Sequence, residues 1–443
     1  MSSRRSFLKS SGAVVAVSAL PVDRFAFGAS NSDTLKLALI GCGGRGSGAA
    51  SQALNTSNLG PVKLVAAGDI HEDRMESALK NLQKTHGESA DVPKDRQFLG
   101  FDAYKKAIAE ADVVILSTPP GFRPVHFEEA VRQGKHIFME KPVASDADGV
   151  RRVLAAAVEA KKKNLKIGVG LQRHHQKGYI ETVQRLHDGA IGDITSARCY
   201  WNGQRPWQKK RADLEVQLGK KLTELEYQLR NWYYFTWICG DHITEQHIHN
   251  IDVINWVKKG PPVKARAMGG REINLGGSDD GEAFDHFACE FEYADGSICY
   301  SYCRHQPGCW NSVSEHVQGT KGRSDINRYI ITGDNQWRYN EQGGPRDAYQ
   351  QEHTDLFTAI REGKAYSEIE HGASSTMTAI LGRMAAYSGK ELEYDAALKS
   401  EIGVFPKAFY EGKADAWQTI EPPTKPGPDG LYPRAIPGKT KVV

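Results

Sequence analysis

Short apolar runs alternate with longer amphipathic segments over the first third of the chain. The runs have the length of buried strands, and the amphipathic segments repeat their apolar residues at helical spacing. This alternation predicts an α/β domain at 34–163 with a Rossmann-type, doubly wound parallel sheet. The expected strands are 34–41, 62–67, 113–117 and 136–139, and the expected helices are 47–54, 72–84, 104–109, 127–133 and 146–163.

The pattern changes after about residue 165. Polar and apolar residues take turns over 284–302, which is typical of antiparallel strands with one covered face, and Asp295-Gly296 fits a two-residue hairpin turn. A strand at 167–170, an aromatic-rich insertion at 203–238 and a helix at 374–387 are also expected. We therefore predict a second, α+β domain at 164–400 with a large, mostly antiparallel sheet, followed by an extended tail at 401–443 that is rich in proline and glycine.

The first 29 residues have a pattern of their own. Arg4-Arg5 precede Phe7, Leu8 and Lys9, an apolar stretch covers 12–20, and small residues surround position 29. This segment, 1–29, resembles a twin-arginine export signal. The resemblance implies export to the periplasm or beyond, by a route that carries proteins already folded around a cofactor. The alternative is a basic tail or a short core helix.

Composition excludes several classes of protein. The 443 residues are 40% hydrophobic and 25% charged, and no apolar run reaches the length of a membrane span. The chain holds 57 basic and 54 acidic residues, and removal of 1–29 leaves 53 of each. A neutral mature chain has no electrostatic footprint for nucleic acid or for an anionic membrane, so we expect neither partner.

The seven cysteines are odd in number and include no CxxC pair, so a disulfide scaffold is not indicated. The two-residue turn would put Cys289 beside Tyr302, on the face opposite to Cys299 and Cys303. If one bridge forms, this register favours Cys303–Cys309.

A glycine-rich turn follows the first predicted strand and opens the first predicted helix. Gly41, Gly43 and Gly46 have the GxGxxG spacing of a dinucleotide-binding loop, which also contains Gly44 and Arg45. Asp69 ends the second strand, where a carboxylate accepts hydrogen bonds from the adenosine ribose and disfavours a 2′-phosphate. The sequence thus predicts NAD; the nearby Arg74 keeps NADP open as an alternative. Thr118-Pro119, at the end of the third strand, should form the floor of the nicotinamide half of the site.

The fourth strand ends in Glu140-Lys141-Pro142. Together with Thr118-Pro119 and the turn at 319–322, this sequence resembles the glucose–fructose oxidoreductase/inositol dehydrogenase/MocA (Gfo/Idh/MocA) family. The resemblance implies hydride exchange between a nicotinamide nucleotide and a sugar, polyol or sugar derivative. It also implies a homodimer or homotetramer built through an open C-terminal sheet, and places Glu140 and Lys141 at the cofactor.

The resemblance continues into a helix expected from Asp241 to about Val257. It gives His249 the general acid/base position and Asp252 a supporting one in the substrate site, with Glu245 where relatives more often have Asp. Lys141 would stabilise oxygen charge and His249 would move the proton, its ring oriented by a carboxylate. Arg173 would bind substrate, and the aromatic segment around Trp232 would stack on a sugar ring, although half of those aromatics could equally be core residues.

Three histidines crowd this segment and, with Glu245, raise the alternative of a metal site. Only His242, Gln246 and His249 share one helical face, since His247 points about 160° away from His249 by the helix period. The site is therefore expected to hold no metal.

These features favour an NAD(P)-dependent oxidoreductase that acts on CH–OH groups, with Lys141, His249 and Glu245 as catalytic residues. Because free NAD is scarce outside the cytosol, one alternative is a glycoside hydrolase that holds NAD tightly and uses it transiently through oxidation, elimination, addition and reduction. A sugar–sugar oxidoreductase with one retained cofactor lies between these two. A non-enzymatic, nucleotide-dependent sugar-binding protein is a further alternative.

Overall fold

The computed structural model describes residues 33–273, 279–340, 347–411 and 420–443. The expected export signal at 1–29 lies outside these residues. Within the described ranges no helix has both the length and the hydrophobicity that crossing a bilayer requires.

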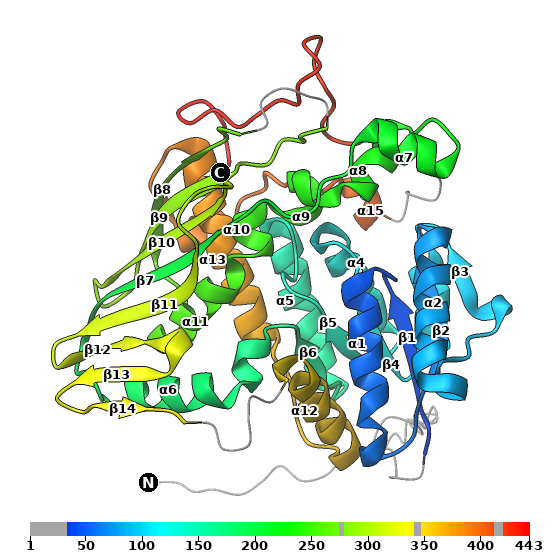
Figure 1. The fold of residues 1–443 in the computed structure, drawn as a ribbon, viewed down its shortest axis with the longest axis horizontal. Helices are drawn as coiled ribbons and strands as arrows, with labels where there is room; N and C mark the ends of the chain where they lie inside the picture. The colour runs from blue at the N-terminus through cyan, green and yellow to red at the C-terminus, as the bar shows by residue number, and fades with distance from the viewer. Residues whose placement is uncertain (1–32, 274–278, 341–346, 412–419) are drawn as a thin grey trace, which may run out of the picture.

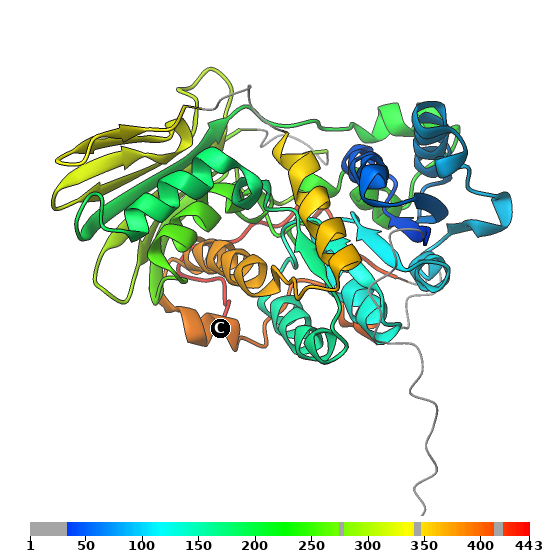
Figure 2. The same ribbon diagram turned by 90° about the horizontal axis from the view of Figure 1, so that it is seen from below.

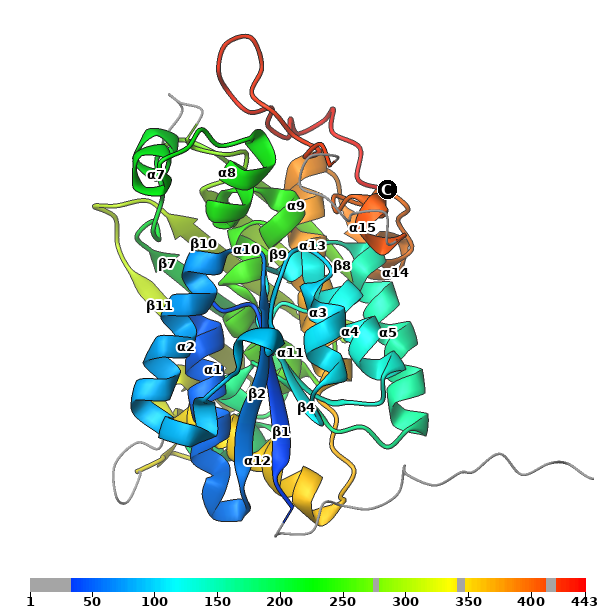
Figure 3. The ribbon, with the colours of Figure 1, turned by 90° about the vertical axis from the view of Figure 1, so that its right-hand side faces the viewer.

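The N-terminal part of the chain forms a six-stranded parallel sheet in the order β3-β2-β1-β4-β5-β6, with helices on both faces (Figure 1; Figure 3). This is the doubly wound order in which ligands bind at the carboxyl ends of the strands. The elements are β1 (Leu35–Ile40), α1 (Gly44–Leu54), β2 (Val62–Asp69), α2 (Glu72–His86), β3 (Gln97–Leu99), α3 (Ala103–Ala109), β4 (Val113–Leu116), α4 (Arg123–Arg132), β5 (His136–Met139), α5 (Ala147–Lys162) and β6 (Ile167–Val169).

The predicted parallel α/β fold is confirmed, with three differences of detail. Helix α1 begins at Gly44, directly in the glycine turn, rather than at Ser47. The short edge strand β3 gave no apolar run to detect. The sheet also includes β6, past the boundary expected at residue 163, because Ile167–Val169 pairs in parallel with β5.

The second part contains a nine-stranded, mostly antiparallel sheet in the order β14-β13-β12-β11-β7-β10-β9-β8-β15, which confirms the predicted class. The exception is the β7–β10 pair, which is parallel. Helices cover one face of this sheet (Figure 2). The strands are β7 (Ile194–Gly203), β8 (Lys264–Gly270), β9 (His286–Glu292), β10 (Ile298–His305), β11 (Ser312–Gly319), β12 (Gly322–Asp325), β13 (Ile330–Gly333), β14 (Trp337–Arg338) and β15 (Leu392–Glu393).

The helices of this part are α6 (Lys177–His187), α7 (Arg211–Leu218), α8 (Glu224–Arg230), α9 (Thr236–Cys239), α10 (His242–Glu245), α11 (Ile248–Lys258), α12 (Ala348–Glu362), α13 (Ile369–Ser388), α14 (Tyr394–Leu398) and α15 (Lys407–Tyr410). Helices α11 and α13 pack on the sheet, whereas α12 returns to the first domain and packs against α1. The single helix expected from Asp241 to Val257 is wrong: the chain breaks it at Gln246 and His247 into α10 and α11.

The hairpin register differs from the prediction by one residue. Ile298 pairs with Glu292 and Tyr293 N–H donates to the Ser297 carbonyl, so the turn has three residues and ends at Gly296 with a φ of 81°. Cys289 therefore lies opposite Ser301 rather than Tyr302, on the same covered face as Cys299 and Cys303. The expected face was wrong because a three-residue turn shifts every side chain across the sheet.

All seven cysteines lie in the described part of the chain, and none forms a disulfide. The bridge expected between Cys303 and Cys309 is absent: Cys303 is buried under the sheet, and Cys309 is exposed.

The insertion and the C-terminal tail together build a third, smaller core. Large side chains of both segments interleave around Trp237: Leu225, Tyr227 and Phe235 come from the insertion, and Phe405, Phe409 and Tyr432 from the tail. The described tail is thus packed, and includes α15, rather than simply extended. We call residues 203–238 together with the described residues from 401 onward the cap. In Figure 1 the cap lies above the carboxyl ends of the parallel strands.

Candidate functional site

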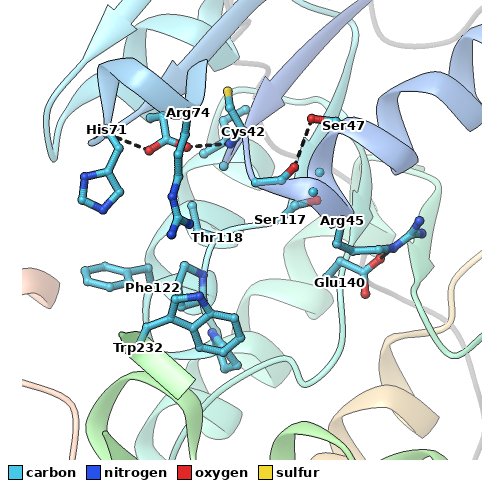
Figure 4. A pocket seen from close by; sticks show the side chains of 18 of the residues that line it. Cys42, Arg45, Ser47, His71, Arg74, Ser117, Thr118, Phe122, Glu140 and Trp232 are labelled. Carbon is cyan, nitrogen blue, oxygen red and sulfur yellow. Dashed lines mark hydrogen bonds and ion pairs between the residues drawn. The ribbon is translucent and has the colours of Figure 1, made fainter. Parts of the chain in front are cut away.

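A cavity of about 1100 Å³ lies where the two domains and the cap meet. Its walls come from the carboxyl ends of β1, β2, β4 and β5, from α10 and α11, and from the cap. Figure 4 shows side chains from the first domain and Trp232 of the cap around this space. The volume suits a dinucleotide together with a small substrate.

The glycine loop has the form that a dinucleotide requires. Gly41 has a φ of 92°, and a Cβ on Gly46 would lie 2.0 Å from the Gly41 carbonyl oxygen, so neither position accepts a side chain. Gly43 caps α1 without a side-chain hydrogen bond, and a Cβ on Gly44 would meet nothing within 4 Å. The first N–H groups of α1 are therefore left for an anionic ligand such as a pyrophosphate.

Asp69 sits beside this loop at the end of β2. Its Oδ2 accepts a hydrogen bond from the Cys42 N–H at 2.6 Å, and its Oδ1 accepts one from the His71 N–H at 2.8 Å (Figure 4). Burial raises the pKa of Asp69, and these backbone donors and Arg74 act in the opposite direction. The carboxylate still has acceptor capacity left for a ribose hydroxyl. Arg74 lines the same end of the cavity.

Arg45 lines the cavity but is held by carboxylates. It pairs with Glu140 at 2.5 Å and with Glu352 of α12 at 2.9 Å, and its guanidinium lies 4.9 Å from the Tyr349 ring centre. Through Arg45, helix α12 is thus connected to the glycine loop and to the Glu140-Lys141-Pro142 segment.

The strand-end residues Thr118 and Pro119 line the cavity as expected. The buried Arg123 holds them in place, because its guanidinium donates to the carbonyl oxygens of Thr118 and Pro142. Pro142 follows a cis peptide bond. Nothing in the sequence pattern had singled out Arg123.

Lys141 and Glu245 meet in the cavity wall. Lys141 Nζ lies 3.1 Å from Glu245 Oε1 and also donates to the Glu245 carbonyl oxygen. Burial raises the pKa of Glu245, while Lys141 acts to lower it. The Nζ atom keeps one further N–H for a ligand.

His249 lines the cavity from the first turn of α11. Its Nδ1 has no hydrogen-bond partner among the described residues. Its ring stacks on that of Trp201, with ring centroids 5.9 Å apart and an angle of 24° between the planes. Burial lowers the pKa of His249 well below its usual range, and the nearby positive charges of Lys141, Arg173 and Arg45 add to this effect. A neutral imidazole has a lone pair that can take up a proton.

Asp252 and Arg173 have other partners than expected. The Asp252 carboxylate accepts hydrogen bonds from His174 and from Ser375, both at 2.8 Å, and it does not line the cavity. Arg173 does line the cavity, but its guanidinium is paired with the buried Glu315.

The three crowded histidines point to three different places. His247 Nε2 lies 2.7 Å from Ser301 Oγ, under the sheet, and the ring of His242 lies 4.3 Å from that of His305. Only His249 faces the cavity. Among the described residues no group of three or more histidine, cysteine, aspartate or glutamate side chains could hold a metal ion.

Several further residues line the cavity, and most of them belong to no motif of the sequence. Trp232 lines the cavity as expected, and Gln172, Trp201, Trp207, Lys209, Gln246 and Tyr349 also do. Trp201 lies near the end of β7, and only the pairing of that strand inside the second sheet brings it over His249.

Comparison with known proteins supports this architecture. Residues 35–169 match a family model described as an oxidoreductase family with an NAD-binding Rossmann fold, and residues 179–325 match the GFO/IDH/MocA C-terminal domain. Together these two matches cover more than half of the chain. Residues 1–21 match the twin-arginine translocation pathway signal sequence, which confirms the predicted signal.

Among curated proteins, the chain is 26% identical over 225 residues to an inositol 2-dehydrogenase/D-chiro-inositol 3-dehydrogenase of Halalkalibacterium halodurans, covering 51% of this chain and 53% of that protein. An inositol 2-dehydrogenase of Ralstonia nicotianae is 27% identical over 238 residues, covering 53% and 58%. The chain therefore spans about half the length of the curated relatives it matches.

Solved structures share the fold over most of the chain. An aldose-aldose oxidoreductase from Caulobacter crescentus, complexed with glycerol, superposes with a TM-score of 0.62 at 17% identity, covering 82% of this chain and 100% of that one. A levoglucosan dehydrogenase in complex with NADH and levoglucosan gives a TM-score of 0.63 at 17% identity with the same coverage.

Proposed function

The chain belongs to the Gfo/Idh/MocA family of oxidoreductases, and from this premise we propose that it exchanges hydride between NAD and a CH–OH carbon of a sugar, polyol or sugar derivative. The observation that carries the proposal is the convergence of Lys141, Glu245 and His249 on one cavity that also contains the dinucleotide loop. This convergence also argues against the alternative of a non-enzymatic, nucleotide-dependent sugar-binding protein. We further propose that the exported enzyme works in the periplasm.

The residues of the cavity fit NAD. The N–H groups at the start of α1, among Gly43, Gly44 and Arg45, would hold the pyrophosphate, and Asp69 would bind the ribose hydroxyls, which favours NAD over NADP. Thr118 and Pro119 would border the nicotinamide. When bound, the nicotinamide ring supplies the hydride acceptor or donor.

The chain itself supplies the proton chemistry. In the oxidising direction, the neutral imidazole of His249 accepts the hydroxyl proton of the substrate. The Lys141 ammonium, anchored by Glu245, stabilises the negative charge that develops on the substrate oxygen. In the reducing direction the same groups act in reverse.

The remaining cavity wall suits an uncharged ring. Arg173 and Arg45 line it but are neutralised by Glu315, Glu140 and Glu352, so neither offers an unpaired charge to a carboxylate substrate. Trp201 and Trp232 provide aromatic faces that stack on the C–H face of a sugar. We therefore favour a neutral sugar or polyol.

The cap supports a retained cofactor. Trp207, Lys209, Leu229 and Trp232 of the cap line the cavity opposite the glycine loop, so a nucleotide bound there would be covered. A retained cofactor suits an exported enzyme. Three reaction schemes are compatible with a retained cofactor: a dehydrogenase with a second substrate, a sugar–sugar oxidoreductase and a glycoside hydrolase that uses NAD transiently.

Two measurements test the proposal. Protein purified after export is denatured, and any released nucleotide is identified and quantified by mass; we expect NAD or NADH at close to one per chain. The intact protein is then mixed with sugars and polyols while the nicotinamide absorbance is followed. Absence of bound NAD, together with no redox change for any substrate when NAD is added, would contradict the proposal.

Deuterium oxide distinguishes the hydrolase from the dehydrogenases. A hydrolase of this type would cleave a glycoside and incorporate solvent deuterium at the carbon next to the oxidised one. A dehydrogenase or a sugar–sugar oxidoreductase would leave glycosidic bonds intact.

A further inference from the structure

Within the described ranges, six lysine and arginine side chains line the large cavity. Four of them are bound by acceptor groups of the protein: Arg45, Arg123, Lys141 and Arg173. The other two, Arg74 and Lys209, make no ion pair and no side-chain hydrogen bond with any residue that the structure describes. We call these two residues the cation pair. A cation that faces a cavity without a partner is available to an anionic ligand.

Arg74 lies over the glycine loop. A Cβ on Gly43 would lie 4.0 Å from its Nη1 atom, and Figure 4 shows its side chain pointing into the cavity toward Thr118. Gly43 directly precedes the first turn of α1, whose free N–H groups suit a pyrophosphate. The guanidinium therefore lies beside the place where that group would bind.

Lys209 lies on the cap, at its junction with α2. Its backbone N–H donates to Asn231 Oδ1 at 3.1 Å. Arg230, the residue before Asn231, binds Asp73, which directly precedes Arg74 on α2. These contacts bring the two members of the cation pair to the same end of the cavity, from two different parts of the fold.

The positive charge at this end of the cavity is not fully compensated. Burial lowers the pKa of Lys209, and the charges of Arg74 and Arg230 lower it further. Burial also lowers the pKa of Arg74, on which Asp69 acts in the opposite direction. By contrast, burial of Arg45 is outweighed by its carboxylate partners, and its pKa is raised. An anion bound at the cation pair would supply the missing negative charge.

A diphosphate is the anion that fits this place best. Its oxygens could accept hydrogen bonds from the N–H groups of α1 and from the cation pair together, since arginine offers a planar fork of donors and lysine a compact charge. A 2′-phosphate fits less well, because the Asp69 carboxylate occupies the end of β2 where that group would lie.

We propose that the cation pair binds the diphosphate of the cofactor from two sides, with Arg74 on the nucleotide-binding domain and Lys209 on the cap. This inference rests on the proposed function, because it takes NAD as the ligand. Without the cofactor the two like charges repel each other, and the diphosphate neutralises them. Binding of the cofactor therefore stabilises the contact between the cap and the first domain. Arg74 then serves a group that NAD and NADP share.

The test compares ligands that differ only in their phosphates. Full-length protein is freed of bound nucleotide with charcoal and titrated calorimetrically at low ionic strength with ADP, adenosine and adenosine 2′,5′-bisphosphate. K209M removes the charge of the cap lysine and keeps most of its length. K209M and R74M should each weaken the binding of ADP by about 5- to 50-fold and leave that of adenosine unchanged.

K210M is the matched control. Lys210 is the next residue of the cap, is exposed and does not line the cavity. This variant should bind all three ligands as the wild type does.

Hydrogen exchange reports the effect on the cap. ADP should slow amide exchange over residues 203–238 in the wild type and in K210M, whereas adenosine should not. The effect of ADP should be smaller in K209M. Exchange that responds equally to ADP and to adenosine would contradict the stabilising role of the diphosphate.

The outcomes separate this inference from the proposed function. Equal ADP affinity in K209M and K210M would overturn the role of the cation pair. A loss confined to the 2′,5′-bisphosphate would overturn it as well, because it would assign the two cations to a ribose phosphate. The expected ADP results without hydride transfer to any substrate would support the cation pair and remove the proposed function. A wild type that binds neither ADP nor NAD would remove both.

A measurement on the unmodified protein covers the case in which the variants do not fold. In a crystal structure with bound ADP, Lys209 Nζ and a guanidinium nitrogen of Arg74 should each lie about 3 Å from a diphosphate oxygen. A Lys209 side chain that points to solvent would overturn the proposal.

Discussion

Among the contacts that join the cap to the nucleotide-binding domain is an ion pair that can be removed cleanly. Arg230, at the end of α8, donates from Nη1 to Asp73 Oδ2 at 3.0 Å and from Nη2 to Asp73 Oδ1 at 2.8 Å. Asp73 lies on α2 and borders the large cavity. We call this pair the clasp, and we predict that R230Q speeds the release of bound NAD.

The size of the effect follows from the geometry of the clasp. A charged hydrogen bond contributes about 1.5–3 kcal/mol when it is shielded from water. The Arg230 side chain is 10% exposed, but the Asp73 side chain is 44% exposed, so solvent screening reduces the pair to about 1–2 kcal/mol. At about 1.4 kcal/mol per factor of ten, loss of the clasp should raise the NAD release rate about 5- to 30-fold.

The assay is the loss of bound nucleotide over time after rapid dilution into a large excess of unlabelled NAD, starting from protein loaded with labelled NAD. K220A is the matched control. It breaks the pair between Lys220 and Glu226, which lies within the cap, at 2.6 Å, and does not contact the nucleotide-binding domain. The control should release NAD at the wild-type rate.

The swap R230D/D73R restores an ion pair with the charges reversed, and should recover part of the retention. Arg230 holds the pKa of Asp73 below its ordinary value through their hydrogen bond, so the clasp should remain charged down to pH values below the usual aspartate range. Equal release rates for R230Q, K220A and the wild type would refute the idea that the cap retains the cofactor through this contact.

Four further predictions are independent of the clasp. K141A should lower the single-turnover rate of hydride transfer by roughly 10²- to 10⁴-fold while NAD stays bound, measured by nicotinamide absorbance and nucleotide content; a near-wild-type rate would exclude the proposed role. D69A should weaken NAD more than NADP in calorimetric titrations, and an unchanged affinity ratio would contradict the ribose assignment. Since burial lowers the pKa of His249, activity should stay level as the pH falls through the ordinary histidine value of about 6.5, and a loss centred there would show an unperturbed group. A thiol reagent should modify Cys309 rapidly in the native protein and all seven cysteines only after denaturation; fewer than seven would reveal a disulfide.

The cofactor half of the site was predictable from sequence because its geometry is local. A glycine turn between β1 and α1 and a carboxylate at the end of β2 are fixed by short-range backbone constraints, and the sheet order then brings Thr118 and Lys141 to the same edge. Spacing in the sequence therefore carried the information for these residues.

The substrate half was less predictable because it depends on contacts between distant segments. The helical period put Glu245, His249 and Asp252 on one face, but a break separates α10 from α11. Glu245 and His249 both line the cavity, whereas Asp252 binds His174 instead. Trp201 reaches His249 only through the pairing of strands that are far apart in the sequence. A hairpin turn longer by one residue was likewise enough to reverse the face of Cys289.

The cap shows how such long-range packing acquires a function. From the sequence, one segment was expected to be an aromatic-rich insertion and the other an extended tail rich in proline and glycine. Neither segment could bury its aromatic residues alone, and the packing of Trp237 against Phe405 and Phe409 supplies the apolar contact that holds the two segments together. Because residues of the cap line the cavity, a nucleotide bound there would be enclosed by this core. This enclosure is the structural basis of our proposal that the exported enzyme retains its cofactor.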